Sequence, residues 1–237
     1  MKGVSFALGA GEILGLVGGS GSGKSTIAKT IVGLERPSSG DVRIAPGVSV
    51  QMVFQDAAGS LNPRMSVRTA LEEALRHARS RGASTPEELL SLVGLSEAVL
   101  AQYPREMSGG QCQRVSIARA LACRPDLLIA DEPVSALDVS VQARVLNLLR
   151  DLRRRLGLAI LLVAHDLAVV KNVCDRVCVM EDGLIVESGD SDEVFARPKS
   201  PCVKRLISCV SSVFSFNEQQ SPGGLLTQEP RKCKIRS

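Results

Sequence analysis

A glycine-rich loop near the start of the sequence has the residue types that bind phosphate. Residues 18–25 fit the pattern G-x-x-x-x-G-K-[ST], in which glycines let successive amide N–H groups turn toward an anion. The Lys24 ammonium would reach the β- and γ-phosphates of a nucleotide, and the Ser25 hydroxyl would ligate Mg²⁺. A flexible Gly/Ser linker is the alternative, which the apolar run before the loop and the helical pattern after it disfavour. The residues expected to contact the nucleotide here are Gly18, Gly19, Ser20, Gly21, Ser22, Gly23, Lys24, Ser25 and Thr26.

Two adjacent acids, Asp131 and Glu132, follow the apolar run 127–130. Ligands of parallel sheets bind at the carboxyl edge of the strands, where Asp131 would hold Mg²⁺ through water and Glu132 would polarise an attacking water. Alone, two acids after a strand more often cap a helix or lie in a solvated turn. Together with the phosphate loop they indicate a nucleotide site.

The elements that must position these residues alternate between apolar runs and helical stretches, which favours an α/β fold with a mainly parallel sheet. Continuous apolar runs such as 159–163 are typical of strands that are covered on both faces. The Asp-Gly pair 182–183 predicts the turn of a β-hairpin. The expected strands are 13–17, 49–54, 127–130, 159–163, 177–180 and 184–186, and the expected core helices are 25–32 and 141–156.

Residues 57 to about 113 differ in pattern, because they hold amphipathic helical stretches, at 67–79 and 86–93, and no strand-like run. We therefore expect a small helical subdomain inserted between strands of the main sheet. After about residue 197 the periodicity is lost. The last part, 215–237, is rich in Gln, Ser, Pro and Gly and is expected to be poorly ordered.

Composition and charge narrow the class of protein. The 237 residues are 44% hydrophobic and 23% charged, as in ordinary globular proteins. The longest apolar run, 156–164, is too short to span a bilayer, which takes about 20 residues, and the N-terminus lacks a signal peptide's apolar stretch. We expect a cytosolic protein that meets a membrane only through a partner. The net charge is +4, but the segment from Lys199 onward has seven basic and two acidic residues, which leaves −1 for the rest and argues against nucleic-acid binding.

A short sequence, Met107-Ser108-Gly109-Gly110-Gln111, resembles the signature of ATP-binding cassette (ABC) ATPases. Gln55 is similar to the family's glutamine loop, residues 135–138 to its D-loop and His165 to its switch histidine. Six motifs in the family's order are far more specific than any one of them. The resemblance implies a P-loop NTPase (RecA-like) core with a small antiparallel β part and hydrolysis of ATP with Mg²⁺. It divides the chain into a cassette, 1–197, with the helical subdomain at about 57–113, and a C-terminal segment, 198–237.

The resemblance also implies a role for each motif. In the family, two cassettes pack head to tail, and the signature of one copy contacts the γ-phosphate that the phosphate loop of the other holds. Without the other motifs, a lone His or Gln after a strand would be structural or solvated, and Ser-Gly-Gly would be a helix cap. The family implies that Glu132 is the general base and that His165 senses the γ-phosphate, that Ser25, Gln55 and Asp131 hold the metal, and that Gln55, Ser108, Gly109, Gly110, Gln111 and Asp138 contact the nucleotide.

Three further segments, 55–67, 135–142 and 200–207, resemble ATP-binding subunits of dipeptide, oligopeptide and nickel importers. This likeness implies an ATPase at the cytoplasmic face of the cell membrane that energises uptake of peptides or nickel. Its implied partners are integral membrane permease subunits, a second ATPase cassette, identical or not, and indirectly a solute-binding protein. No nucleic-acid partner is expected.

The sequence departs from the family where adenine stacks on an aromatic residue, because nothing aromatic precedes Phe6. Either the chain starts late or nucleotide affinity is reduced, since one lost stack costs about 1–3 kcal/mol. Cys112 stands where Arg is usual, and Val134 where Thr is common. Two other functions stay open: a soluble cassette ATPase not coupled to transport, such as the phosphonate-lyase accessory type, and a non-hydrolysing regulatory cassette.

Overall fold

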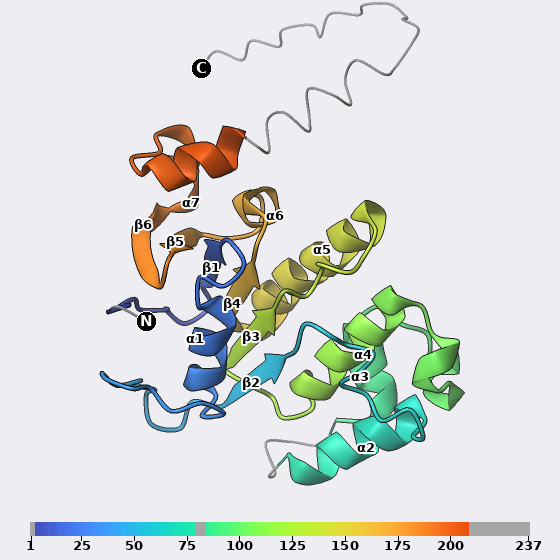
Figure 1. Cartoon of the computed structure of the whole chain (residues 1–237). Coiled ribbons are helices and arrows are strands. Elements are labelled where there is room, and N and C mark those ends of the chain that lie inside the picture. Colours follow the sequence, from blue (N-terminus) through green and yellow to red (C-terminus); the bar gives the residue numbers. More distant parts are fainter. Residues whose placement is uncertain (1–2, 79–83, 209–237) are drawn as a thin grey trace, which may run out of the picture.

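A six-stranded sheet is the centre of the molecule (Figure 1). The computed structural model describes residues 3–78 and 84–208. The strand order is β2-β3-β4-β1-β5-β6. The first five are parallel, and β6 runs antiparallel to β5 across the predicted Asp-Gly turn. The strands are β1 (Ile13–Gly18), β2 (Val50–Val53), β3 (Leu127–Asp131), β4 (Ala159–Ala164), β5 (Arg176–Glu181) and β6 (Leu184–Asp190).

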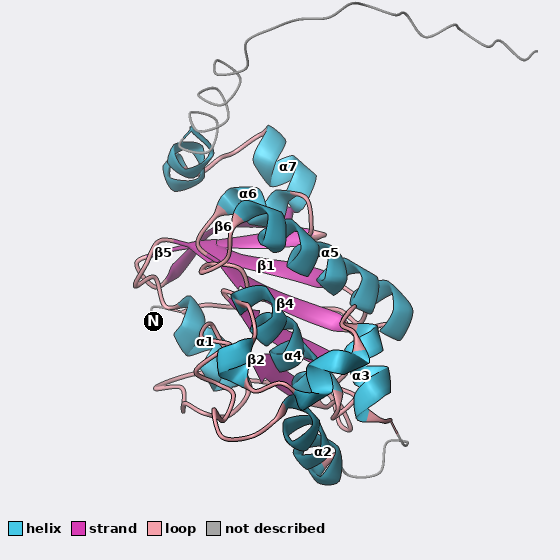
Figure 2. Ribbon diagram, turned by 90° about the vertical axis from the view of Figure 1, so that its right-hand side faces the viewer, coloured by secondary structure: helices cyan, strands magenta, loops and turns pink. Residues whose placement is uncertain are grey.

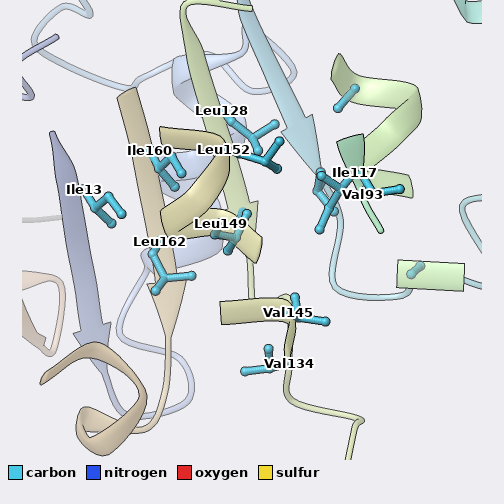
Figure 3. Close-up of a cluster of buried hydrophobic side chains, with 14 of the residues drawn as sticks. Ile13, Val93, Ile117, Leu128, Val134, Val145, Leu149, Leu152, Ile160 and Leu162 are labelled. Atoms are coloured by element: carbon cyan, nitrogen blue, oxygen red, sulfur yellow. The ribbon is translucent and has the colours of Figure 1, made fainter. Parts of the chain in front are cut away.

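Both faces of the sheet are covered, which explains why β1 and β4 are apolar and buried along their whole length. Successive side chains of a strand point to opposite faces, so Ile13 and Leu14 belong to two different buried clusters. Helix α1 (Lys24–Ile31) supplies the cluster of Leu14. Helix α5 (Val139–Leu156) covers the other face, as Figure 3 shows for Leu149 and Leu152.

A group of helices lies beside β2, at one end of the sheet (Figures 1 and 2). No described residue between 57 and 113 is in a strand. The chain enters these helices through side-chain caps: the Ser66 hydroxyl accepts the Thr69 amide, and Thr85 forms a capping box with Glu88, which satisfies free amides of the first turn. The elements are α2 (Val67–His77), α3 (Pro86–Leu92), the 3₁₀ helices η1 (Glu97–Ala101) and η2 (Pro104–Glu106), and α4 (Gly109–Leu121). The subdomain limits at 57 and 113 stay a prediction.

The end of the described chain is more regular than the sequence suggests. Helices α6 (Leu167–Lys171) and α7 (Ser191–Ala196) flank the hairpin, and residues 201–208 are helical. This last helix is held from outside, since the Glu187 carboxylate accepts the Ser200 amide at 2.7 Å and Arg205 pairs with Glu181 at 2.6 Å. These contacts with the hairpin stabilise a helix that the periodicity of its own sequence does not predict. The segment expected to be poorly ordered, 215–237, lies outside the described residues.

One negative finding concerns membranes. In the ranges 3–78 and 84–208, no helix is both long and apolar enough to cross a bilayer.

Candidate nucleotide-binding site

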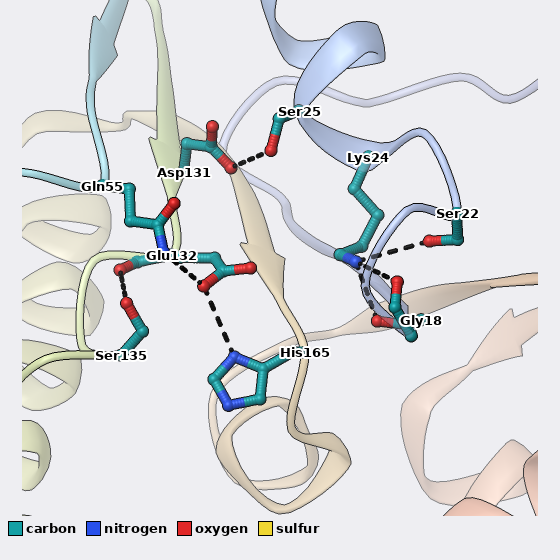
Figure 4. A network of polar contacts seen from close by, with 10 residues as sticks. Gly18, Ser22, Lys24, Ser25, Gln55, Asp131, Glu132, Ser135 and His165 are labelled. Atoms are coloured by element: carbon teal, nitrogen blue, oxygen red, sulfur yellow. Dashed lines mark hydrogen bonds and ion pairs between the residues drawn. The ribbon is translucent and has the colours of Figure 1, made fainter.

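The motifs meet at the carboxyl edge of the parallel strands. Strands β3, β4 and β1 are neighbours in the sheet. Their ends carry, in that order, Asp131 with Glu132, His165 and the phosphate loop, and β2 leads into Gln55. Figure 4 shows Gln55, Asp131, Glu132 and His165 together beside the phosphate loop. Strand order alone therefore assembles residues that are up to 147 positions apart in the sequence.

The phosphate loop turns tightly between β1 and α1. A Cβ at Gly18 would lie 2.2 Å from the Met180 carbonyl oxygen of β5, so only glycine fits there. Gly21 and Gly23 have φ angles of 79° and 100°, a region that residues with a Cβ rarely adopt. An added Cβ at Gly19 would have no atom within 4 Å, so this side of the loop is open. The glycines therefore let the backbone turn tightly between β1 and α1, and the loop is open at Gly19.

The Lys24 side chain lies inside the loop and is bonded to it. Its ammonium donates to the carbonyl oxygens of Gly18 and Gly19, both at 2.8 Å, and to the Ser22 hydroxyl at 3.3 Å. Only 5% of Lys24 is exposed. Burial lowers its pKa, and the charges of Glu132 and Asp131 oppose that shift. A cation is thus held in the loop, on hydrogen bonds that a phosphate oxygen could replace.

Two oxygen donors suited to a hard cation lie beside the loop. The Ser25 hydroxyl donates to Asp131 Oδ1 at 3.1 Å. Asp131 is 5% exposed, and burial raises the pKa of its carboxyl, against the hydrogen bond from Ser25, which lowers it. A carboxylate and a hydroxyl at this distance fit Mg²⁺, which binds oxygen ligands and keeps several waters.

Glu132 is the point where three elements converge. Its Oε2 accepts a hydrogen bond from Gln55 Nε2 at 2.9 Å and lies 3.5 Å from His165 Nδ1. Gln55 follows β2 and His165 follows β4, so the carboxylate bridges both neighbours of β3. The His165 side chain is 55% exposed against 18% for Glu132, which leaves the imidazole free to turn toward a ligand.

The Glu132 backbone has a left-handed conformation, with φ of 46°, which is costly for a residue with a long side chain. Two neighbours hold it there. Its amide donates to the Val163 carbonyl at 2.9 Å, and its own carbonyl accepts the Ser135 hydroxyl at 3.1 Å. This left-handed conformation directs the Glu132 side chain away from the line of β3 and into the site. The sequence marks Ser135 as part of the D-loop motif but carries no sign that its hydroxyl holds the Glu132 carbonyl.

The signature residues form a separate structure. Ser108 and Gln111 close a capping box at the start of α4, with the Gln111 amide donating to Ser108 Oγ at 3.3 Å and the Ser108 amide to Gln111 Oε1 at 2.9 Å. Ser108 and Gly109 are exposed and Gly110 is buried. Among the described side chains, none of this group has a hydrogen bond or ion pair with residues 18–26.

The D-loop packs directly against the signature. A Cβ at Gly110 would lie 2.4 Å from Val141 Cγ1, and one at Gly109 would lie 3.3 Å from Leu137 Cδ2. Asp138 caps α5 by accepting the Val141 amide at 3.0 Å and the Ser140 hydroxyl at 2.7 Å. These hydrogen bonds lower the pKa of Asp138, that from Ser140 most.

Two further residues hold this region, and neither stood out in the sequence. Gln142 Nε2 donates to the Leu137 carbonyl at 2.9 Å, and Arg114 donates to the carbonyls of Gly110 at 3.3 Å and Gly94 at 3.1 Å. Gln142 and Arg114 bond to backbone carbonyls five and four positions earlier, and Arg114 also reaches Gly94, 20 positions away. Of the predicted loop residues, Ser20 and Thr26 are exposed and make no contact with the acids at the edge.

The family model described as "ABC transporter" matches residues 1–135. The oligopeptide transport ATP-binding protein OppF of Lactococcus lactis (strain IL1403) is 45% identical over 231 residues, with 90% of this chain and 72% of the relative covered. OppF of Escherichia coli K12 is 46% identical over 229 residues, with 89% of this chain and 69% of the relative covered.

Solved structures agree with the sequence relatives. A dimeric post-hydrolysis state of the ATP-binding cassette MJ0796, bound to ADP and Pi, has a TM-score of 0.70 and 30% identity over 81% of this chain and 90% of that one. CbiO1 of Clostridium perfringens, part of the ABC transporter complex cbiONQ, has a TM-score of 0.73 and 27% identity over 92% of both chains. The chain belongs to the ABC transporter family, whose ATP-binding cassettes it matches in sequence and in fold.

Proposed function

We propose that the chain is the ATP-binding and ATP-hydrolysing subunit of an ABC importer for peptides. The observation that carries the proposal is the meeting of Gln55 and His165 on the Glu132 carboxylate, at the edge where Lys24 closes the phosphate loop. A base held between two polar groups beside a phosphate site is suited to activate water against a γ-phosphate. The relatives named as oligopeptide transport proteins support the peptide as cargo.

Binding of ATP would begin at the open side of the loop. The amides of residues 18–25 and the start of α1 point their partial positive charge at the triphosphate. Lys24 would exchange the carbonyls of Gly18 and Gly19 for phosphate oxygens. Ser25 and Asp131 would hold Mg²⁺, with Gln55 close by, and the bound metal would neutralise charge on the phosphates.

Hydrolysis would depend on the residues at the strand ends. Glu132 would orient and deprotonate the attacking water, since its carboxylate is already turned into the site by the strained backbone. His165, more than half exposed, would turn from Glu132 to the γ-phosphate. Gln55 would couple changes in the position of Glu132 to the helical insertion, because it lies between Glu132 and the chain that leads to α2.

A second cassette would complete the site. Ser108 and Gly109 present a hydroxyl and an exposed backbone at the start of a 13-residue helix, with Gly110 behind them. A helix start suits an anion, yet these residues make no polar contact with the described phosphate loop of their own chain. Head-to-tail pairing would bring them to the partner's γ-phosphate, with Gln111 and Asp138 beside them. The dimeric ADP-bound and Pi-bound cassette supports this arrangement.

A cavity of about 310 Å³ next to Gln55 is where we place the permease contact. It lies between the end of β2 and helices α2 and α4, and Met52, Phe54, His77 and Arg119 are among its lining residues. Phe54 is 38% exposed although it is aromatic. A short helix of an integral membrane subunit would fill such a groove, which would hold the cassette at the cytoplasmic face of the cell membrane. A solute-binding protein would act on the permease and not on this chain.

The variant Glu132→Gln tests the hydrolytic role. We expect the Kd for Mg-ATP to stay within about threefold of the wild-type value while turnover falls by about 10²–10⁴, and a dimer to appear by size-exclusion chromatography with Mg-ATP. The control is Glu97→Gln, an exposed glutamate of η1 away from the edge, which should change neither quantity. Unchanged turnover in Glu132→Gln would refute its role as base.

Copurification from native membranes tests the coupling to transport. Tagged wild-type protein should bring down an integral membrane permease, and Phe54→Glu should reduce the recovered permease at least several-fold. Leu184→Glu on β6 is the matched control, since Leu184 is also 38% exposed and lies outside the groove. Recovery with soluble proteins alone would favour the uncoupled, accessory type of cassette.

A further inference from the structure

A second cavity lies at the amino edge of the sheet, opposite the phosphate loop. Its volume is about 370 Å³. Its walls are the last turns of α5, the end of α6, the residues before β5 and the turn between β6 and α7; Figure 2 shows the three helices in the same part of the molecule. The residues that line it are Arg150, Arg153, Arg154, Lys171, Asn172, Val173, Cys174, Asp175, Asp190, Ser191 and Asp192.

The basic residues of this cavity are mostly unpaired. Arg153 is used by the fold: Nε donates to the Gly11 carbonyl at 2.6 Å, and Nη2 lies 3.1 Å from Asp175. Arg150, Arg154 and Lys171 form no ion pair or hydrogen bond through their side chains with any residue that the structure describes, and Lys171 only lies over the Phe195 ring at 5.8 Å. Three cations thus stand at one opening without a counter-charge of their own.

The lining holds three carboxylates beside its four cations, but among the described residues none of the three forms an ion pair with Arg150, Arg154 or Lys171. Asp175 accepts the Ile13 amide at 2.8 Å besides pairing with Arg153. Asp190 Oδ1 accepts the amides of Asp192 and Glu193 at 3.0 and 3.4 Å, and so caps α7. Two of the three lining carboxylates are therefore committed to the backbone, and the third, Asp192, is exposed to solvent.

A second observation concerns a buried serine at this cavity. Ser191 is 3% exposed and lines the cavity, and its hydroxyl has no hydrogen-bond partner among the residues that the structure describes. A buried hydroxyl without a partner is rare, because burial removes its hydrogen bonds to water and no protein group replaces them. The Ser191 oxygen is buried below the cavity surface, so we expect it to donate to a ligand oxygen only after a shift of the start of α7. Guanidinium groups, an ammonium and a hydroxyl together form a donor set for oxyanions.

We propose that this cavity binds a phosphate monoester of a small metabolite, with Arg150, Arg154 and Lys171 on the phosphate group and the Ser191 hydroxyl as a further donor. The cavity volume of about 370 Å³ is far larger than the roughly 30 Å³ of a single water molecule. A phosphate group, which is a few water volumes in size, would therefore leave room for the organic part of the ligand. The site is separate from the nucleotide edge, because it lies where the strands begin and not where they end.

Isothermal titration of the full chain tests the proposal, with glucose 6-phosphate and inorganic phosphate as probes at constant ionic strength. The phosphate loop is blocked with Mg²⁺ and a non-hydrolysable ATP analogue. We expect saturable binding of glucose 6-phosphate, weakened by about tenfold or more in Arg150→Gln/Arg154→Gln. The matched control, Arg144→Gln/Arg155→Gln, removes two exposed arginines of the same helix outside the cavity and should change the affinity by less than about twofold.

Several outcomes overturn the site. No saturable binding to the wild-type protein refutes it, and equal losses in both double variants show a diffuse charge effect instead. Binding that disappears in Lys24→Ala without the analogue places the probe at the phosphate loop. Inorganic phosphate that binds as tightly as the ester shows that a free anion, and not a metabolite, is the ligand. The ATPase activity of Arg150→Gln/Arg154→Gln is measured separately, so failure here leaves the proposed function untouched.

Discussion

In the phosphate loop, the Lys24 ammonium donates to carbonyls of its own loop, whereas at the signature Ser108 and Gln111 satisfy each other in a closed capping box. The loop side holds a buried charge, an acid whose pKa burial raises and a strained glutamate. The signature side holds an exposed cap and two glycines, one packed against Leu137 of the D-loop and the other against Val141 of α5.

The contrast indicates that the two halves of the site do different work. The loop half contains a buried cation and carboxylates that ATP and Mg²⁺ would contact directly, so binding of these ligands would stabilise the folded state. The signature half needs nothing from the nucleotide to keep its shape. It would act as a preformed cover, moved as one body with the D-loop.

The largest effect should come from Lys24→Ala, which removes the cation of the loop half. We expect the affinity for ATP, measured by isothermal titration, to fall by at least about 100-fold, because hydrogen bonds to charged groups contribute about 1.5–3 kcal/mol each. Lys29→Ala on the same helix, whose ammonium lies 3.7 Å from Glu35, should stay within about threefold. An affinity retained in Lys24→Ala would contradict the assignment of the loop.

Gly110→Ala tests the close packing between the signature and the first turn of α5, directly after the D-loop. The added methyl would meet Val141, whose χ1 angle is stiff in a helix, and overpacking costs about 1–3 kcal/mol. ATPase activity should fall by about tenfold. Gly110→Ala/Val141→Ala, with room restored, should regain activity to within about threefold of Val141→Ala alone. If the double variant stays as slow as Gly110→Ala, the glycine is needed for another reason.

The smallest effect concerns the cap of α5. Asp138→Ala should lower the melting temperature by a few degrees, since the first-turn amide of Val141 loses its acceptor, while Asp138→Asn keeps a cap without charge. The pKa of Asp138 is lowered in the folded state, so its charge stabilises the fold at pH values above the ordinary aspartate range of about 3.9. The wild type should lose its advantage over Asp138→Asn as the pH falls through that lowered pKa. A constant difference down to pH 2 would refute this.

Much of the fold was predictable because it follows from local pattern. Continuous apolar runs gave β3 and β4, the Asp-Gly pair gave the hairpin, and the glycine loop stands between a strand and a helix as expected. The expected helix 67–79 is observed to His77, and Arg79 lies outside the described residues. What pattern could not give is the helix at residues 201–208, which depends on contacts with Glu187 and Glu181 of the hairpin.

The features of the site also divide into those that local motifs predict and those that depend on tertiary contacts. The sequence named Asp131, Glu132 and His165, since motif types and order mark them. It could not show that Glu132 sits at φ of 46° or that Gln55 donates to its carboxylate. These depend on neighbouring strands, and the register of a parallel sheet leaves no trace in the spacing of distant motifs.

The contact of Gly18 with the Met180 carbonyl has a consequence for any attempt to transplant the nucleotide loop. A peptide of residues 10–35 would keep every amide that faces a phosphate, yet it would lack the wall against which the turn is pressed, which a strand 162 positions later provides. Such a fragment would contain the residues of the motif but would not be held in the tight turn that the loop has in the folded chain. Grafting would have to carry β5 along with the loop.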